Sequence, residues 1–296
     1  MWFNNLQIYR LDTAWDMDAE RLDQALSSRT FQPCGAMDME SVGWQSPFGK
    51  EALVRAVGGH WLLCLGQEQK LLPAAVINQV SQERAAETEE REGYRPGRKQ
   101  MRELKERVRD ELLPRAFTRR HSTALWIDPT GGWLMVDTSS AAKADGVLEL
   151  LRKCVPDLPV SLLKTKRSAA GAMRQWLELD EAPAGFTVDQ DCELRSELEE
   201  KATVRYAHHP LDTDEVKKHV REGKCPTRLS MTWGNRVSFV LTERMEVKKL
   251  TFLDVVKEQA LDAESAEEQF DADFSFMTLE LERLLPDLVA ALGGEN

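Results

Sequence analysis

The chain has 296 residues, 42% of them hydrophobic, which is enough to bury a substantial core and on length alone suggests two domains. Its formal net charge of −11 argues against a protein whose whole surface attracts nucleic acid, because that binding depends on neutralising phosphates. The longest apolar runs are too short to cross a bilayer and the N-terminus has no signal-peptide pattern, so we expect a cytoplasmic protein.

Residues 1–73 predict the first part of a central α+β domain. Asp18 can cap a helix over 19–27, and the prolines and glycines of 31–47 predict loops. Short segments with the composition of strands cover 2–11, 54–57, 60–65 and 70–72.

Residues 74–113 predict a helical hairpin that projects from this domain. Pro73 precedes a helical pattern that runs to Arg91, and a second helix extends from Arg98 to Leu113. The connecting residues 93–97 contain two glycines and a proline, and Pro114 ends the second helix.

The remaining chain predicts the second part of the central domain over 114–170 and a C-terminal α+β domain over 171–296. Two hairpins are expected, 124–127 with 133–136 and 228–233 with 237–241. The other predicted strands cover 156–163, 203–208 and 248–253, and the other helices cover 140–153, 173–179, 212–222, 264–269 and 276–292. The expected fold class is therefore α+β, with antiparallel sheets, packed helices and a projecting helical hairpin.

Positive charge is concentrated in one segment. Between Arg91 and Arg120 there are eleven basic and five acidic residues, a local charge of +6 in an acidic chain. At about 100° per residue, one stripe of the second hairpin helix carries four cations, Arg98, Arg102, Lys105 and Arg109, with Lys99 beside them. This geometry fits a ladder of phosphates, although from the helix alone an ordinary solvated face with local ion pairs is the favoured alternative.

The segment that follows this helix shifts the balance toward anion binding. It contains Arg115, Arg119, Arg120 and His121, with only apolar residues and hydroxyls between them. Arginine can hold a phosphate through two hydrogen bonds. Phe117 could stack on or wedge between bases if it is exposed, although the sequence alone favours a core residue that anchors the base of the hairpin.

Other candidate sites have weaker support. Lys164, Lys166 and Arg167 form a second small basic cluster, in a predicted loop. His208 and His209 are adjacent on a predicted strand, so they point in opposite directions and are not expected to share a metal.

Catalysis is not expected from these residues. The five cysteines are scattered without a CxxC spacing, which indicates free thiols and no zinc site. Asp271, Asp273, Glu280 and Glu282 invite a metal-nuclease hypothesis, but the aromatic residues around them favour packing with solvated acids. No Walker A, GxSxG or HExxH motif is present, so we expect no enzyme, no cofactor and no metal site.

Several segments in order resemble the RdgC family of recombination-associated DNA-binding proteins of proteobacteria. The resemblance covers essentially the whole chain and rests on residues 2–11 (WFNNLQIYRL), 31–35 (FQPCG), 42–47 (VGWQSP), 70–77 (KLLPAAVI), 112–117 (LLPRAF), 125–128 (LWID), 211–216 (LDTDEV), 270–274 (FDADF) and 292–295 (LGGE).

The resemblance implies a ring-shaped homodimer, associated with the nucleoid, that encircles duplex DNA without sequence preference. It further implies inhibition of RecA-promoted strand exchange, with single-stranded DNA as an additional candidate ligand. Phe117 matches the family's Leu-Pro-Arg-Ala-Phe motif near the DNA gate. His208 and His209 replace residues that are usually basic or amide-bearing, so their contact with DNA depends on protonation.

We therefore expect duplex DNA to contact Arg98, Lys99, Arg102, Lys105, Arg109, Arg115, Phe117, Arg119, Arg120, Lys164, Lys166, Arg167, His208 and His209. The alternative is a regulatory module whose basic hairpin docks on an acidic protein partner.

Overall fold

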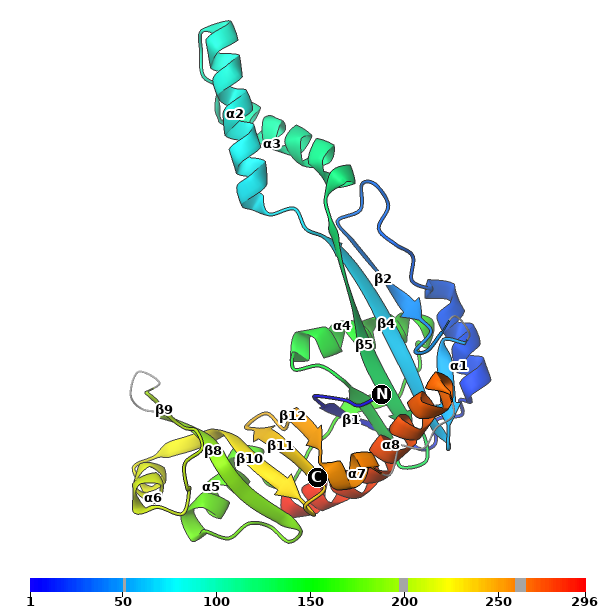
Figure 1. Ribbon diagram of the computed structural model, residues 1–296, viewed down its shortest axis with the longest axis vertical. Helices are drawn as coiled ribbons and strands as arrows, with labels where there is room; N and C mark the ends of the chain where they lie inside the picture. Colours follow the sequence, from blue (N-terminus) through cyan, green and yellow to red (C-terminus); the bar gives the residue numbers. More distant parts are fainter. Residues whose placement is uncertain (50–51, 197–201, 259–264) are drawn as a thin grey trace.

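A computed structural model describes residues 1–49, 52–196, 202–258 and 265–296. Within them the chain forms two antiparallel β-sheets and eight α-helices, which confirms the predicted α+β class (Figure 1). No helix in the described part of the chain is both long and apolar enough to cross a membrane.

The N-terminal sheet has seven strands. Its hydrogen-bonded order is β2-β4-β5-β6-β1-β7, and β3 also pairs with β4. The strands are β1 (Gln7–Leu11), β2 (Glu40–Gln45), β3 (Val54–Val57), β4 (His60–Lys70), β5 (Thr118–Asp128), β6 (Trp133–Val136) and β7 (Val160–Leu162).

Two helices, α1 (Ala19–Leu26) and α4 (Ala141–Cys154), share one hydrophobic cluster with this sheet. Asp18 caps α1, as the sequence predicts, and Ser140 caps α4. Each side chain accepts a hydrogen bond from a backbone N–H of the first turn of its helix.

Between β4 and β5 the chain forms α2 (Ala74–Glu92) and α3 (Arg98–Leu112), followed by a short 3₁₀ turn, η2 (Leu113–Arg115). Gly93 ends α2 in the left-handed conformation, at φ 77°, where a side chain would be strained. Figure 1 shows the two helices extending well beyond the end of the sheet, and we call them the arm.

The C-terminal sheet has the order β12-β11-β10-β8-β9. Its strands are β8 (Phe186–Ser196), β9 (Thr203–Tyr206), β10 (Lys224–Trp233), β11 (Val237–Thr242) and β12 (Val247–Phe252). The helices of this part of the chain are α5 (Ala169–Leu179), α6 (Asp214–Arg221), α7 (Asp254–Lys257) and α8 (Ala266–Ala291). In the N-terminal part, a second 3₁₀ turn, η1 (Ser27–Arg29), follows α1.

Helix α8 connects the two sheets. Its buried residues belong to a cluster that joins residues of the N-terminal sheet, such as Leu62 and Trp126, to the core of the C-terminal sheet. Ion pairs hold it on both sides, Arg55 Nε to Asp271 at 2.7 Å and Arg236 Nε to Glu280 at 2.7 Å. The orientation of the two sheets is thus fixed by apolar packing and by these charges.

Gly43 was expected to mark a loop, but it lies within a strand. Residues 31–47 contain β2 rather than only loops, and β4 runs unbroken to Lys70 instead of stopping at Leu65 before a separate strand. Gly43 and Gly66 face each other in the β2–β4 register. A Cβ on Gly43 would lie 2.6 Å from the Phe31 backbone, so this glycine permits a close approach of two chain segments rather than a turn.

Other boundaries also differ from the predictions. β5 begins at Thr118, not Ala124, because its polar first half pairs with β4, and β8 and α7 were not predicted. The helices predicted over 264–269 and 276–292 are one helix, since Phe270 and Phe274 continue its packed face; Glu264 lies outside the described residues.

Candidate nucleic-acid interface

Helix α3 carries its cations on the solvent side of the arm. Val108 is fully buried against α2, and three further apolar residues of its stripe are half-buried. Arg98, Lys99, Arg102, Lys105 and Arg109 are all exposed. The two stripes expected from helical spacing therefore occupy different environments, one packed and one open to solvent.

Several of these cations are not neutralised by neighbouring acids. Arg102 Nε lies 4.0 Å from Glu106, and Arg109 lies 3.1 Å from Asp110, both at exposed positions where an ion pair contributes little. Within the described chain, Arg98, Lys99 and Lys105 form no ion pair. Their charges are available to an external anion.

Phe117 is an exposed ring on a fixed backbone. Its side chain is 84% exposed, so the core anchor favoured by the sequence alone is wrong. Its carbonyl oxygen accepts a hydrogen bond of 2.7 Å from the N–H of Leu71, which holds the chain between η2 and β5 in place. A large aromatic side chain held in water at the base of the arm is suited to stacking or wedging against a partner.

A buried lysine fixes the base of the arm. Lys70 is 6% exposed, and its Nζ donates to the carbonyl oxygens of Ala36, at 2.6 Å, and Leu113, at 2.9 Å. These bonds join the end of β4 to the 3₁₀ turn that follows α3. The arm therefore leaves the sheet through a hydrogen-bonded junction rather than through a free linker.

The basic residues beyond α3 divide into two groups. Arg115 and Arg119 are exposed, and neither forms an ion pair with a described residue. Arg120 instead bonds Glu68, whose side chain is 4% exposed, at 2.8 Å, and lowers the pKa of that carboxyl. Because a buried carboxylate already holds it, Arg120 is a weaker candidate for phosphate binding than its neighbours.

The open face of the C-terminal sheet carries cations that the sequence analysis missed. A pocket of about 210 Å³ on this face is lined by Arg205 of β9, Arg228 of β10, and Lys248 and Lys249 of β12. Lys248 and Lys249 are adjacent, but the three strands are far apart in the sequence, and only strand pairing brings their cations together. The alternation of Arg228, Ser230 and Thr232 with buried apolar residues in β10 is the signal that could have identified this face.

The charges of this open face are mixed, because the carboxylates of Asp189, Asp191 and Glu193 line this pocket and a second one on the same face. Lys248 Nζ lies 2.8 Å from Glu246, and Glu193 lies 3.4 Å from Arg195. Arg205, Arg228 and Lys249 have no ion pair among the described residues. Their side chains can therefore meet an anion without first breaking a salt bridge.

The pocket has no activated nucleophile. Burial raises the pKa of the Cys192 thiol to about 12, and burial together with the charge of Glu215 raises the pKa of the Tyr206 hydroxyl to about 12. Both groups are neutral at physiological pH, so this arrangement is suited to binding rather than to nucleophilic chemistry.

The two histidines lie just beyond β9, which ends at Tyr206 rather than at the predicted residue 208. His208 has a left-handed backbone at φ 52°, and its N–H donates to Asp191 at 2.8 Å. It lines a second pocket on the open face together with Lys249. His209 instead packs its ring beside Tyr206, 5.3 Å between ring centroids.

The small cluster of Lys164, Lys166 and Arg167 lies elsewhere. Its loop lies beside the residues that come after α8, because the N–H of Lys166 donates to the carbonyl oxygen of Gly294 and the N–H of Arg167 to that of Leu292. Figure 1 places the C-terminal end of α8 far from the arm. The structure therefore does not bring this cluster together with the cations of α3.

The four acids that invite a nuclease hypothesis are separated by their partners. Asp271 bonds Arg55, Glu280 bonds Arg236, and Glu282 lies 3.4 Å from His60. Asp273 pairs with the terminal ammonium group of Met1 at 2.9 Å. Asp271, Asp273 and Glu280 are therefore ion-paired rather than merely solvated, and the four acids do not converge on one site.

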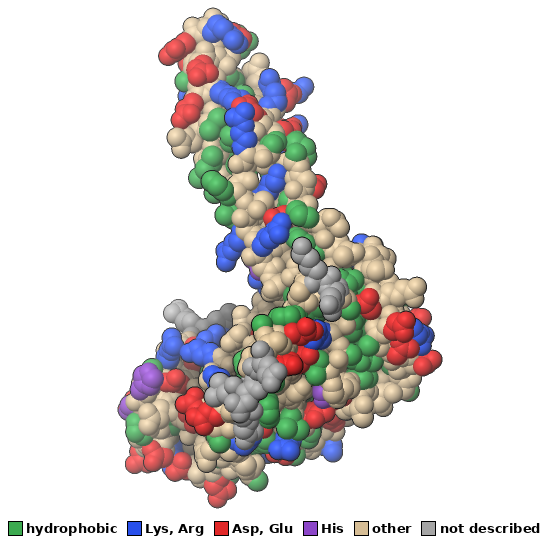
Figure 2. Space-filling view, turned by 45° about the vertical axis from the view of Figure 1, so that its right-hand side comes forward, with side chains coloured by type: hydrophobic (Ala, Val, Ile, Leu, Met, Phe, Trp, Pro, Cys, Tyr) green, Lys and Arg blue, Asp and Glu red, His purple; other side chains and the backbone are tan. Residues whose placement is uncertain are grey.

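The arm and the C-terminal sheet border a concave side of the molecule. In Figure 2 the surface is hollowed between them, and Lys and Arg side chains, interspersed with Asp and Glu, lie along the arm above the hollow and on the part of the molecule below it, near a group of histidines. Cations are thus present on both borders of one concavity, among acidic side chains.

Comparisons with known proteins cover the whole of this chain. The family model described as "Putative exonuclease, RdgC" matches residues 1–295. A "Recombination-associated protein RdgC" of Dechloromonas aromatica is 52% identical over 100% of this chain and 98% of its own length. Proteins of the same name from a Janthinobacterium species and from Herminiimonas arsenicoxydans are each 54% identical, over 100% of this chain and 99% of their own.

Proposed function

This chain belongs to the RdgC family of recombination-associated proteins, and we propose that it binds duplex DNA through the phosphate backbone, without sequence preference and without catalysis. The observation that supports the proposal is the presence of cations without ion pairs, among the described residues, in the arm and on the open face. These cations are Arg98, Lys99 and Lys105 of α3, and Arg228 and Lys249 of the open face.

Phosphate neutralisation accounts for binding without base recognition. Arginine and lysine side chains that contact phosphates carry no sequence information by themselves. Cations on two borders of one hollow can contact two stretches of backbone at once. Phe117, exposed at the base of the arm, adds an apolar contact that bases or sugars can use.

We further propose that two copies close into a ring around the duplex. In such a homodimer the concave sides face each other, so that the cations line the hole while the acidic remainder faces outward. This arrangement reconciles a net charge of −11 with affinity for a polyanion. The arm, which extends beyond the sheet, is the element available to meet the second copy at one side of the ring.

A protein that encloses DNA in this way limits other proteins by occupying their substrate. We propose that this is how the chain restrains RecA-promoted strand exchange in the nucleoid, with single-stranded DNA as a secondary ligand. No base-specific element is needed for this role, since coverage rather than recognition produces the effect.

The word exonuclease in the family description finds no support in the described residues. The acids of α8 are held by Arg55, Arg236, His60 and the N-terminus, and the pocket of the open face contains no ionised nucleophile. We expect no cleavage of linear or circular duplex DNA with Mg²⁺ or Mn²⁺. Nicking that Asp271→Ala or Asp273→Ala abolishes would contradict this expectation.

The proposal is tested by binding to linear and circular duplexes at several salt concentrations. We expect affinity to fall steeply with salt and to change little with sequence. A closed ring should slide off linear DNA more readily than off circles of equal length. If an acidic protein is the true partner, the amount of chain bound should not increase with DNA length, and the DNA proposal fails.

A further inference from the structure

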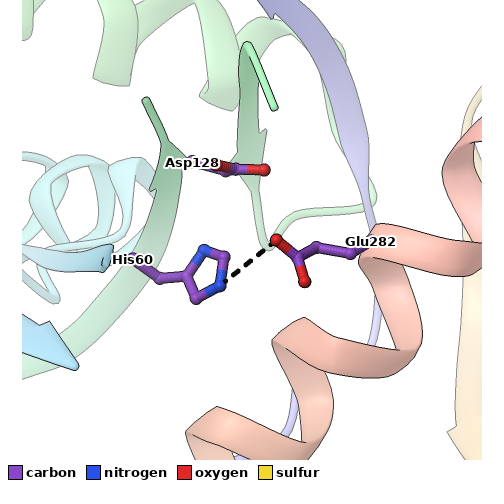
Figure 3. A group of neighbouring side chains, drawn as sticks. All are labelled: His60, Asp128 and Glu282. Atoms are coloured by element: carbon purple, nitrogen blue, oxygen red, sulfur yellow. Dashed lines mark ion pairs between the residues drawn. The ribbon is translucent and has the colours of Figure 1, made fainter. Parts of the chain in front are cut away.

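Three side chains with metal-binding atoms converge where α8 meets the N-terminal sheet. They are His60 at the start of β4, Asp128 at the end of β5 and Glu282 in α8 (Figure 3). One donor atom from each lies within 4.8 Å of the others. The residues are remote from one another in the sequence, so motif spacing could not reveal them.

Two of these side chains have buried polar atoms without a partner. Asp128 is 1% exposed, and its Oδ1 accepts hydrogen bonds from the N–H groups of Thr130, at 3.0 Å, and Gly131, at 2.8 Å. Its Oδ2 is buried and has no hydrogen-bond partner among the described residues. The same holds for Nδ1 of His60. Unsatisfied buried polar atoms are uncommon in proteins and call for an explanation such as an ion.

The charges around the group are also unbalanced. Within the described chain, neither Asp128 nor Glu282 forms an ion pair with a lysine or an arginine, and Glu282 has only the imidazole of His60 at 3.4 Å. Two carboxylates close together, one of them almost fully buried, are costly without a cation. A divalent ion would neutralise both carboxylates.

We propose that His60, Asp128 and Glu282 bind one divalent cation of the zinc type, which braces α8 against the N-terminal sheet. One imidazole nitrogen and two carboxylate oxygens are a donor set that Zn²⁺ accepts, whereas Mg²⁺ prefers oxygen ligands alone. Donors of a tetrahedral zinc ion lie about 3.3 Å apart. Nε2 of His60 and Oε1 of Glu282 already have a similar separation, 3.4 Å, so Nε2 is the ligand nitrogen and the orphaned atom that the ion satisfies is Oδ2 of Asp128.

To bring all three donor atoms to the spacing of zinc ligands, the side chain of Glu282 has to move, and it is free to do so. Glu282 is 37% exposed, whereas the side chain of His60 is 12% exposed and the ring of Trp126 packs 5.7 Å from it. Rotation of Glu282 can close the distance to Asp128, and the same exposed side gives the ion its entry path and a water molecule for the fourth position. With three protein ligands from three elements, the ion would hold the junction of helix and sheet together.

The test measures zinc binding and thermal unfolding of the full chain after treatment with a chelator, without DNA. We expect one equivalent of Zn²⁺ to bind in calorimetry and to raise the melting temperature, and an equal concentration of Mg²⁺ to have no effect. Wild-type protein that binds no stoichiometric Zn²⁺, or that Zn²⁺ does not stabilise, would overturn the proposal.

Three conservative variants identify the ligands. Asp128→Asn keeps the oxygen that accepts from Thr130 and Gly131 and removes only the charge, and His60→Gln and Glu282→Gln preserve size. Each should weaken zinc binding at least about tenfold. The matched control is His219→Gln, because His219 also lies beside one glutamate, Glu222 at 3.8 Å, but has no second carboxylate. Zinc binding that survives all three variants, or is lost in the control, contradicts the assignment.

Discussion

Removal of the α3 charges is the sharpest test of the proposed DNA interface. The variant combines Arg98→Ala, Arg102→Ala and Lys105→Ala, three exposed cations on one stripe. Their only ion pair within the described chain is the 4.0 Å contact of Arg102 with Glu106, so the variant should lose little stability. We expect a change in the free energy of unfolding of no more than about 0.5 kcal/mol.

The effect on DNA binding should be much larger. Each lost phosphate contact should flatten the slope of log affinity against log salt by about 0.9, which is about fivefold in affinity near 0.15 M salt. Three lost contacts per chain amount to about a hundredfold. Fluorescence anisotropy with a short duplex at four or more salt concentrations measures both quantities.

A control variant with the same change in charge separates a local effect from a general one. Arg21→Ala, Arg29→Ala and Arg221→Ala remove three exposed cations from α1, η1 and α6, which belong neither to α3 nor to the C-terminal sheet. This control should bind DNA nearly as the wild type does. If the α3 variant remains a folded dimer in sedimentation and keeps its affinity and salt slope, the stripe does not contact DNA. If it becomes monomeric first, the arm closes the ring instead.

Three further perturbations follow from single residues. Phe117→Ala should weaken DNA binding with little change in melting temperature, because the ring is 84% exposed; a loss of about 3–5 kcal/mol in stability would instead indicate a buried anchor. Lys70→Met should cost about 1–3 kcal/mol in urea unfolding, since the carbonyl oxygen of Leu113 loses its donor, and unchanged stability would contradict the proposed junction. Arg120 lowers the pKa of Glu68, so its stabilisation is present above the ordinary glutamate pKa and disappears as pH falls through the lowered value. Unfolding of Glu68→Gln and wild type at several pH values should therefore converge in acid, and a difference that grows in acid would refute the sign.

Local sequence signals were reliable where a few adjacent residues control the conformation. Asp18 caps α1 as predicted, Gly93 ends α2, and the turn over 128–132 joins β5 to β6. These features depend on backbone conformation and on hydrogen bonds within a few residues, so the sequence contains the information needed. The α3 stripe was predictable for the same reason, because helical periodicity fixes which residues share a face.

Long-range packing decided what the local pattern misrepresented. Gly43 resembles a loop residue in the sequence, but its lack of a side chain lets β2 approach the chain at Thr30 and Phe31 closely. The polar half of β5 is a strand only because β4 pairs with it along its whole length. Phe117 is a large apolar residue of a type that is usually buried, and only the path of the chain between η2 and β5 leaves it in solvent.

The sequence by itself determined the α+β class, the basic segment on an acidic chain and the family. The tertiary structure alone assembled the open face, where Arg205, Arg228 and Lys249 come from three strands, and the group of His60, Asp128 and Glu282 at the helix–sheet junction. The physical reason is that sheet pairing and helix packing join residues at any separation along the chain, whereas sequence patterns report only neighbours within one element.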